Sequence, residues 1–296
     1  MEFNQLESFI NVVNLKSFSK AAEKLFLTQP TVSNNVQSLE KELGTVLINR
    51  NNKRITVTAE GELLYSYAVN MLNMRDRASS EIGKLKGRIC GNLELSSSTI
   101  PQEYILPRYL KEFSVMYPDM TFTINQKDSK NVVDDVIKGY TNYGITGAVY
   151  ESKQLEYIPF YEDRIVLAVP HCHRFQFDDY EEIDFKLLST EKLIMREEGS
   201  GTRKILEKAF ADSGLSISSM DIVSSVESNE TIKKMVELDM GITFMSEIAI
   251  KNEIKLNLIK PLLVKGLDIR RQFYFVYSKN RYLSPLAEKF KKFLIS

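Results

Sequence analysis

The pattern of apolar and polar positions is most regular between residues 17 and 43, where it predicts two short helices joined by a tight turn. One face of the first helix is apolar, through Phe18, Ala21, Ala22, Leu25 and Phe26. Thr28 is placed to cap the second helix, and Pro30 falls in its first turn, where a missing N–H costs nothing. The second helix is expected to bury Val32, Val36, Leu39 and Leu43. Its other positions are expected to face outward with hydroxyl and amide groups, namely Gln29, Thr31, Ser33, Asn34, Asn35, Gln37 and Ser38.

Small polar side chains on the free face of a second helix suit phosphates and base edges, so this layout predicts a helix-turn-helix with that helix in the DNA major groove. The alternative is an ordinary helical pair in another fold. The flanking pattern favours the helix-turn-helix, because an amphipathic helix precedes it at Leu6, Phe9, Ile10 and Val13. A basic segment at Arg50–Arg54 then lies between two short apolar runs, which predicts a winged hairpin over residues 46–57.

We therefore expect residues 1–58 to form an all-α winged helix-turn-helix domain. The candidate DNA contacts are the polar residues of the second helix together with the basic residues around it: Lys20, Thr28, Gln29, Pro30, Thr31, Ser33, Asn34, Gln37, Arg50, Lys53 and Arg54.

A long helix is predicted over about residues 59–86, capped by Thr58 with Glu60 and Glu62 in its first turn. Apolar residues follow a 4-then-3 spacing through Leu64, Ala68, Met71, Ala78, Ile82 and Leu85, which is typical of a coiled-coil seam. Such a helix would be on the order of 40 Å long, so pairing with a second copy is the economical way to cover it. The alternative is a helix that packs on its own domain. Glycines at 83, 87 and 91 predict a hinge, so residues 59–91 form the linker and dimerisation segment.

From residue 92 onward strands and helices alternate, which predicts an α/β module with parallel sheets flanked by helices. Two such units would form two lobes around a cleft, as in periplasmic binding proteins. The chain is expected to cross between lobes near Tyr161–Asp163 and to return near Lys265–Leu267. The first lobe would then comprise residues 92–161 and 267–296, and the second residues 162–266.

Ligands of open parallel sheets bind beyond the carboxyl ends of strands, facing helix N-termini. Hydroxyl- and amide-rich strand ends follow the predicted strands at residues 96–99, 196–203 and 227–231. Converging helix N-termini favour an anion, although the same residues could be helix caps alone. The candidate ligand contacts are Ser98, Thr99, Thr146, Gly147, Ser200, Gly201, Thr202 and Asn229.

Composition adds limits rather than a function. The chain has 39 basic and 39 acidic residues. Electrostatic attraction to DNA would therefore depend on where the basic residues lie rather than on the net charge. No segment is apolar and long enough to span a bilayer, and no signal peptide is evident, so we expect no membrane association and a cytoplasmic location. Two cysteines do not make a disulfide framework.

Other classes of protein are less consistent with the sequence. His171, Cys172 and His173 could suggest a metal, but adjacent residues of an extended chain point to opposite sides, so we predict no metal site. No nucleophile elbow, P-loop or dinucleotide-binding glycine motif is present, so we expect no enzyme activity and no cofactor. The remaining alternative is a two-lobed small-molecule-binding protein without a regulatory role.

The order of these elements resembles the LysR-type transcriptional regulators. The similarity rests on FNQLESFINVV, SFSKAAEKLFLTQPTVSNNVQSLEKELG and LINRNNKRITVTAEG, and it extends over the whole chain. One departure is Asn34, where family members often carry a basic residue. The resemblance implies duplex DNA, a small-molecule effector and further copies of the chain as partners, in a homodimer or homotetramer, with RNA polymerase as a possible further partner.

Segments of the second half narrow the resemblance. SSSTIPQEYILP, REEGSGTRKILEKAF and NRYLSPLAEKF are similar to the branch tied to sulfur assimilation, and STIPQEYILP and REEGSGTRK to relatives associated with selenium metabolism. This comparison implies effector contacts at Ser98, Thr99, Ser200 and Thr202.

Overall fold

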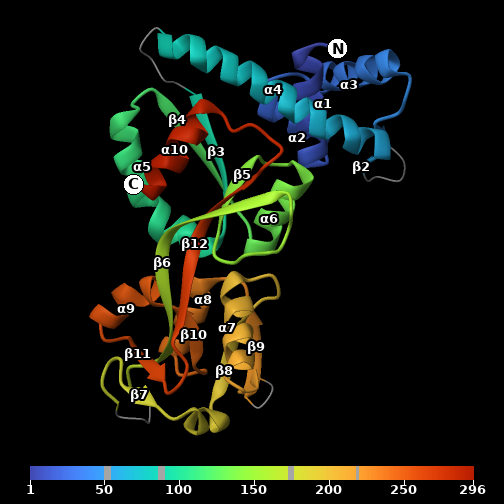
Figure 1. Ribbon diagram of the computed structural model, residues 1–296. Coiled ribbons are helices and arrows are strands. Elements are labelled where there is room, and N and C mark those ends of the chain that lie inside the picture. Colours follow the sequence, from blue (N-terminus) through green and yellow to red (C-terminus); the bar gives the residue numbers. More distant parts are fainter. Residues whose placement is uncertain (50–54, 86–90, 173–176, 218–219) are drawn as a thin grey trace.

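The molecule is elongated, with the N-terminal helices at one end and two α/β lobes stacked below them (Figure 1). This computed structural model describes residues 1–49, 55–85, 91–172, 177–217 and 220–296. The wing tip predicted at Arg50–Arg54, part of the predicted hinge and His173 lie outside the described residues.

The N-terminal domain packs α1 (Phe3–Leu15), α2 (Phe18–Leu25) and α3 (Gln29–Leu43) around one apolar core. Thr28 caps α3 by accepting a hydrogen bond from the Thr31 amide, and Pro30 lies in the first turn, as predicted. Three details of the prediction are wrong. Leu43 is exposed at the end of α3, and Asn35 faces inward to donate to the Ser8 hydroxyl.

The third correction concerns Phe26, which was assigned to the apolar face of α2. It is instead 96% exposed, because it adopts the left-handed conformation that ends α2, with φ of 55°. The turn thereby points its side chain away from the core, and it lies two residues before the N-cap of α3.

The wing strands β1 (Ile48–Asn49) and β2 (Thr56–Val57) pair antiparallel and are fixed by the helices beside them. Glu40 of α3 accepts hydrogen bonds from the amides of Leu47 and Ile48 at 2.9 and 3.2 Å. Thr58 accepts from the Gly61 amide and thus caps α4 (Ala59–Leu85), as predicted. A side chain at Gly61 would meet the Leu47 carbonyl oxygen at 2.3 Å, so only glycine fits between α4 and the wing.

The predicted seam of α4 is wrong in its first half. Ala68 is fully buried and Leu64 packs against the core of the N-terminal domain, so these two residues belong to the chain's own fold. The apolar side chains exposed on the described part of α4 are Leu63, Tyr67, Met71, Met74 and Ile82, of which Met71 and Ile82 belong to the predicted seam. One face of α4 therefore packs on its own domain, whereas the exposed row leaves pairing with a second copy a prediction.

The first lobe contains β3 (Gly91–Ser97), α5 (Leu106–Met116), β4 (Met120–Gln126), α6 (Ser129–Lys138), β5 (Tyr143–Thr146) and α10 (Pro285–Ile295). A π-helical turn at Pro101–Ile105 leads into α5, where the Leu106 amide reaches the Pro101 carbonyl. The second lobe contains β7 (Glu182–Ile183), β8 (Lys192–Arg196), α7 (Gly201–Asp212), β9 (Asp221–Val226), α8 (Asn229–Glu237), β10 (Thr243–Ser246), α9 (Lys251–Lys255) and β11 (Ile259–Val264).

The sheets are mixed rather than parallel, which corrects the prediction. β3 pairs parallel with β4 and β5, and β8 pairs parallel with β9. However, β5 is antiparallel to β12 (Ile269–Ser278), and β10 and β11 are antiparallel to β6 (Leu155–Pro170). The alternation of helices and strands predicted the parallel pairs correctly, but it carried no signal for the two crossing strands.

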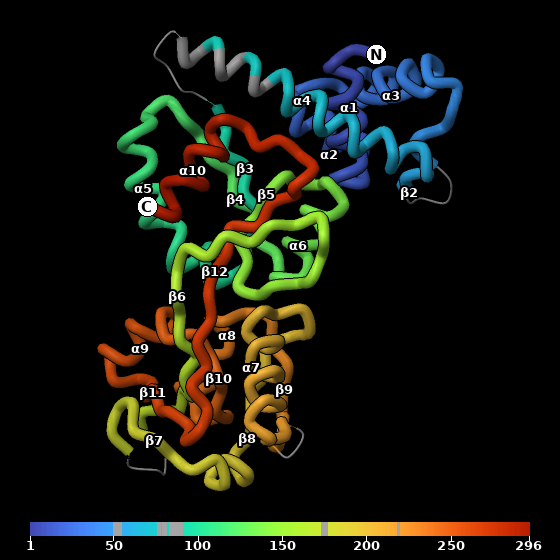
Figure 2. The backbone as a smooth tube through the Cα atoms, in the orientation of Figure 1, coloured from blue at the N-terminus to red at the C-terminus, as the bar shows by residue number. Residues whose placement is uncertain are grey.

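Both connections between the lobes are continuous strands. β6 and β12 run antiparallel from one lobe into the other, with Asp163 opposite Arg271 (Figure 2). The return predicted near Lys265–Leu267 lies a few residues later, because Ile269 still packs in the core of the second lobe. Near the crossing a bulge interrupts the register, which passes from Phe273–Tyr161 to Tyr274–Pro159. Within the described residues, no helix is long and apolar enough to cross a membrane.

Candidate functional site

The first candidate surface is the outward side of α3. Gln29, Thr31, Asn34 and Gln37 are exposed there, and Ser33 is half-buried. Thr28, Pro30 and Lys20 are also exposed, so the described members of the predicted set form a polar surface at and around the N-terminal half of α3. Arg50, Lys53 and Arg54 of the set lie outside the described residues. The exposed N-terminus of a helix suits DNA phosphates through its unpaired amides.

The second candidate site is a pocket between the lobes. It is lined by Ser98, Thr99, Ile100, Asp128, Ser129, Gly147, Arg196, Glu197, Ser200, Gly201, Thr202, Arg271 and Phe273. Six of the eight predicted ligand contacts are therefore brought together here, namely Ser98, Thr99, Gly147, Ser200, Gly201 and Thr202. The cavity measures only about 20 Å³, which is room for about one water molecule. A larger ligand would have to widen the cleft.

The other two predicted contacts lie beside the pocket. Thr146 is fully buried and donates its hydroxyl hydrogen to the Ala148 carbonyl at 3.2 Å. The Asn229 side-chain oxygen accepts from Arg196 at 2.6 Å. Asn229 therefore supports Arg196 of the lining, and Thr146 bridges the turn around Gly147, which also lines the pocket.

Arg271 is the pocket residue that sequence reasoning missed and that changes its chemistry most. Its side chain is 2% exposed, and its Nε donates to the Asp163 carboxylate at 2.7 Å. Nη1 donates to the Thr202 hydroxyl at 2.9 Å, whereas Nη2 is buried without a hydrogen-bond partner among the described residues. Burial lowers the pKa of Arg271, and the charge of Asp163 opposes that change. The guanidinium stays charged at neutral pH, so the pocket holds a cation with a free donor.

A signal for Arg271 was present in the sequence. In β12 the alternate positions Ile269, Phe273 and Phe275 are apolar and buried, and Arg271 occupies the same face of the strand. A charged residue on the inward face of a strand must find a partner, since burying an unpaired charge is very costly.

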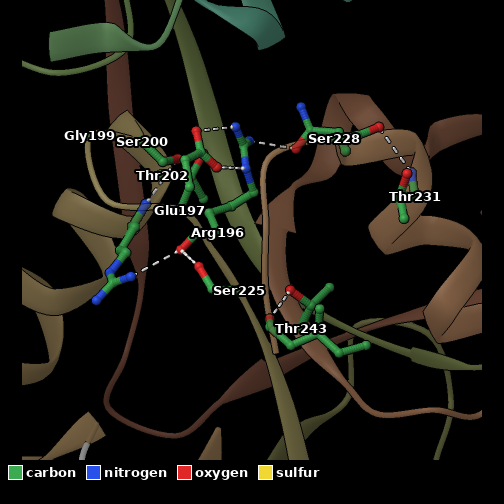
Figure 3. Close-up of polar contacts among 12 residues, drawn as sticks. Arg196, Glu197, Gly199, Ser200, Thr202, Ser225, Ser228, Thr231 and Thr243 are labelled. Atoms are coloured by element: carbon green, nitrogen blue, oxygen red, sulfur yellow. Dashed lines mark hydrogen bonds and ion pairs between the residues drawn. The ribbon is translucent and has the colours of Figure 1, made fainter. Parts of the chain in front are cut away.

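Arg196 forms a second buried cation, at the end of β8 (Figure 3). Its guanidinium makes two hydrogen bonds to Glu197, at 2.7 and 2.9 Å, and one to Asn229. Figure 3 shows Arg196 between Glu197 and the turn that begins α8, where Ser228 accepts from the Thr231 amide. Arg203, in the first turn of α7, binds Glu207 and the Arg196 carbonyl.

Two helices begin at the pocket. Ser200 caps α7 by accepting from the Arg203 amide, and Asp128 caps α6 by accepting from the Asn131 amide at 2.8 Å. The buried Ser98 hydroxyl is a further polar group without a partner among the described residues. Partly positive helix ends, a cation with a free N–H and a free hydroxyl together make a cavity suited to a small anion.

Contacts on either side of the pocket hold the lobes together. On one side the Tyr104 hydroxyl donates to Glu230 at 2.6 Å. On the other, the Tyr150 hydroxyl donates to the Gly199 carbonyl at 3.3 Å, and Lys204 donates to the Val149 carbonyl with its ammonium 3.5 Å from the Tyr150 ring centre. Burial raises the pKa of Tyr150 to about 12 and lowers that of Lys204.

Metal chemistry finds no support in the described residues. Cys172 is exposed there, and no group of histidine, cysteine, aspartate or glutamate side chains in the described ranges is arranged to hold an ion.

Comparison with known proteins settles the family. Residues 3–62 match the family described as "Bacterial regulatory helix-turn-helix protein, lysR family", and residues 86–296 match the "LysR substrate binding domain". This chain belongs to the LysR family. It is a DNA-binding transcriptional regulator with an effector-binding domain, which confirms the predicted fold class and function.

Individual proteins resemble this chain in sequence or in fold. The HTH-type transcriptional regulator CysL of Bacillus subtilis is 32% identical over 98% of this chain and 94% of its own. Full-length OxyR from Pseudomonas aeruginosa has a TM-score of 0.75 at 19% identity, covering 99% of this chain and 93% of that one. The regulatory domain of Synechocystis CcmR, solved in complex with 2-PG, has a TM-score of 0.62 at 25% identity, covering 69% of this chain and 96% of that domain.

Proposed function

We propose that this regulator is switched by a small anion that binds between the lobes, and that the anion is an oxyanion or metabolite of sulfur or selenium. The main observation in favour of an anion is Arg271, which lines the cavity and whose buried Nη2 has no hydrogen-bond partner among the described residues. Ser98, Thr99, Ser200 and Thr202 would supply hydroxyl contacts. Hydrogen bonds to a charged ligand are worth roughly 1.5–3 kcal/mol each.

Hydrogen-bond donors, rather than net charge, favour an anion over a cation in this pocket, because both of its buried cations are paired. The Arg196 charge is matched by Glu197, and Arg271 by Asp163. Asp128 is the remaining acid of the lining, and its carboxylate is directed to Asn131. The free Nη2 donor of Arg271 and the N-termini of α6 and α7 therefore favour an anion as the ligand. The assignment of the anion to sulfur or selenium rests only on the resemblance of the segments SSSTIPQEYILP and REEGSGTRKILEKAF, which contribute to the pocket.

The anion is tested by thermal denaturation of the full chain in sodium sulfate, selenate and thiosulfate, each against sodium chloride at equal ionic strength. We expect at least one oxyanion to raise the melting temperature of the parent and to lose that effect in the Arg271→Met variant. Equal stabilisation of parent and variant would exclude this pocket. No stabilisation of the parent by any of the three would exclude these oxyanions as ligands.

For the DNA-binding domain, we propose that α3 enters the major groove of duplex DNA in the cytoplasm. Gln29 and Ser33 would contact phosphates or bases, and Arg50 and Arg54 would contact the flanking backbone. A Gln29→Ala, Ser33→Ala double variant should stay folded and lose sequence-specific binding to a duplex selected from a random pool. Arg54→Ala should weaken all duplexes alike and flatten the salt dependence. Parent-like binding by both variants would contradict this placement.

We further propose that the regulator acts as a dimer through the exposed apolar row of α4, with tetramers formed by the effector modules and half-sites about one helical turn, or a multiple, apart. RNA polymerase as a partner remains a prediction from the family resemblance, and the absence of catalytic activity remains a prediction from the missing catalytic motifs.

A further inference from the structure

Helix α6 touches both the pocket and the N-terminal domain. At its first turn, the Asp128 carboxylate lies where a side chain on Gly199 would meet it at 3.2 Å, and the Ser129 hydroxyl lies where one on Gly201 would meet it at 2.6 Å. Gly199 and Gly201 belong to the second lobe. The start of α6 is thus one of the parts of the first lobe that lie directly against the second lobe.

The other end of α6 reaches the DNA-binding domain. Tyr140 follows the helix, and its ring makes an edge contact with Tyr65 of α4, with centroids 5.3 Å apart. Tyr65 is 2% exposed and donates its hydroxyl hydrogen to Asn14 of α1 at 2.6 Å. The ring of Tyr65 also lies against Phe9. Tyr140 therefore contacts a residue that is fixed in the core of the DNA-binding domain.

Between these ends α6 is held as one rigid piece. Val132 and Val136 are fully buried, and Arg281 donates to the carbonyls of Val136 and Ile137 at the end of the helix. Ten residues of α-helix span about 15 Å. Figure 2 shows α6 between the N-terminal helices and the second lobe.

We propose that α6 transmits the closure of the lobes to the DNA-binding domain, and that Tyr140 against Tyr65 is the contact through which it does so. This inference rests on the proposed function, because it gives the anion pocket its route to the DNA-binding helices. A ligand that changes the position of Gly199 and Gly201 acts on the first turn of α6, and a rigid helix carries that shift to its other end. The coupling can be no larger than the difference in ligand affinity between the open and closed forms.

The test needs no ligand, because a substitution can force the lobes apart. In Gly201→Val the new side chain would press on Ser129, and rotation of the serine hydroxyl does not clear the space, since Ser129 Cβ lies only 3.3 Å from the position of the first added carbon. The control is Ala211→Val, which introduces the same side chain at an exposed position on the same helix, by adding two carbon atoms rather than three. Gly201→Ala is the milder wedge if the valine variant melts early.

The first readout is fluorescence at the far end of α6. The chain has no tryptophan, so Tyr140→Trp places a sole indole against Tyr65. We expect its emission maximum to shift when Gly201→Val is added and to stay unchanged with Ala211→Val. An indole that does not respond to either glycine variant, in proteins that melt cooperatively, would overturn the proposal.

The second readout is a double-mutant cycle on affinity for a duplex selected from a random pool. Gly201→Val should change the affinity about 5-fold or more in the parent, and less than about 2-fold when Tyr140→Leu is present. Tyr180→Leu is the control background, because Tyr180 is 39% exposed against 37% for Tyr140 and lies in the second lobe.

The proposal fails if Gly201→Val changes affinity equally in the parent and Tyr140→Leu backgrounds. It also fails if Tyr180→Leu abolishes the effect as fully as Tyr140→Leu. Failure of the proposed function would look different, as an absence of oxyanion stabilisation or of selected duplex binding in the parent itself.

Discussion

The buried pair of Arg271 and Asp163 offers the sharpest test of how the pocket is built. Both side chains are 2% exposed, and Ser246 donates a further hydrogen bond to Asp163 at 2.9 Å. Asp163→Ala would leave the Arg271 charge in the interior without its carboxylate. Removing one partner of a buried ion pair costs about 3–5 kcal/mol, a large part of the 5–15 kcal/mol that typically stabilises a domain.

The expected change is large enough to measure by calorimetry. At about 2–4 °C per kcal/mol for a domain of this size, the effector module of Asp163→Ala should melt about 6–20 °C below the parent. The control is Asp268→Ala, which breaks a salt bridge to Arg164 of 2.9 Å in which the aspartate side chain is 52% exposed. A surface pair of this kind is worth about 0–1 kcal/mol. Replacing both buried partners, as in Asp163→Leu with Arg271→Met, should restore most of the lost stability.

In the Asp163→Ala variant, the unpaired Arg271 guanidinium should also bind an anion from the buffer more readily than in the parent. Sodium sulfate should therefore stabilise Asp163→Ala more than it stabilises the parent, when both are compared with sodium chloride at the same ionic strength. Two results would refute this reasoning: a melting temperature for Asp163→Ala no lower than that of Asp268→Ala, or an identical response of parent and variant to sulfate.

Three further predictions follow from other contacts. Leu63→Glu with Met71→Glu, both on the exposed row of α4, should give monomers in sedimentation that lose the selected duplex; a persistent dimer would place the interface elsewhere. Thr202→Val keeps the side-chain volume but removes a hydroxyl that accepts from Arg271 Nη1 and can donate its own hydrogen to an anion. Loss of that donor should weaken binding of the stabilising oxyanion at least about tenfold by calorimetry, and unchanged affinity would take Thr202 out of the site. Because the pKa of Tyr150 is raised to about 12, its protonated form stabilises the fold fully below pH 10, and this contribution is lost between about pH 10 and pH 12. The melting temperature of Tyr150→Phe should fall less over that interval than the parent's, and parallel falls would contradict the assignment.

Local signals account for what the sequence predicted well. Thr28, Ser200, Ser228 and Ser284 each cap a helix at the place where the sequence puts a hydroxyl before an apolar period. A cap acts within one turn, so it can be recognised without knowledge of the rest of the fold. Hydroxyl-rich strand ends likewise predicted five of the residues that line the pocket, namely Ser98, Thr99, Ser200, Gly201 and Thr202.

What the sequence did not reveal depends on distant partners. In the first half of α4 the exposed row departs from the predicted seam, because Leu64 and Ala68 pack in the core of their own domain. The spacing of apolar residues cannot distinguish such packing from packing against a partner chain. The antiparallel crossing strands depend on pairing across about a hundred residues. Arg196 and Arg271 contribute to the pocket because the fold buries them. Phe26 does not lie on the apolar face of α2 because the backbone turns at that residue.

The pairing of β6 with β12 also has a consequence for synthesis of the chain. β6 ends at Pro170 and β12 ends at Ser278, so at 5–20 residues per second the ribosome needs roughly 5–20 s to supply the partner strand. Until then β5, whose residues are all buried in the finished protein, has an open edge, and helix α10 is missing from the first lobe. Unpaired strand edges recruit other chains. The second lobe can complete its own β8–β9 pair during this interval, whereas the first lobe must wait, so the nascent chain is most vulnerable to aggregation while the second lobe is being translated.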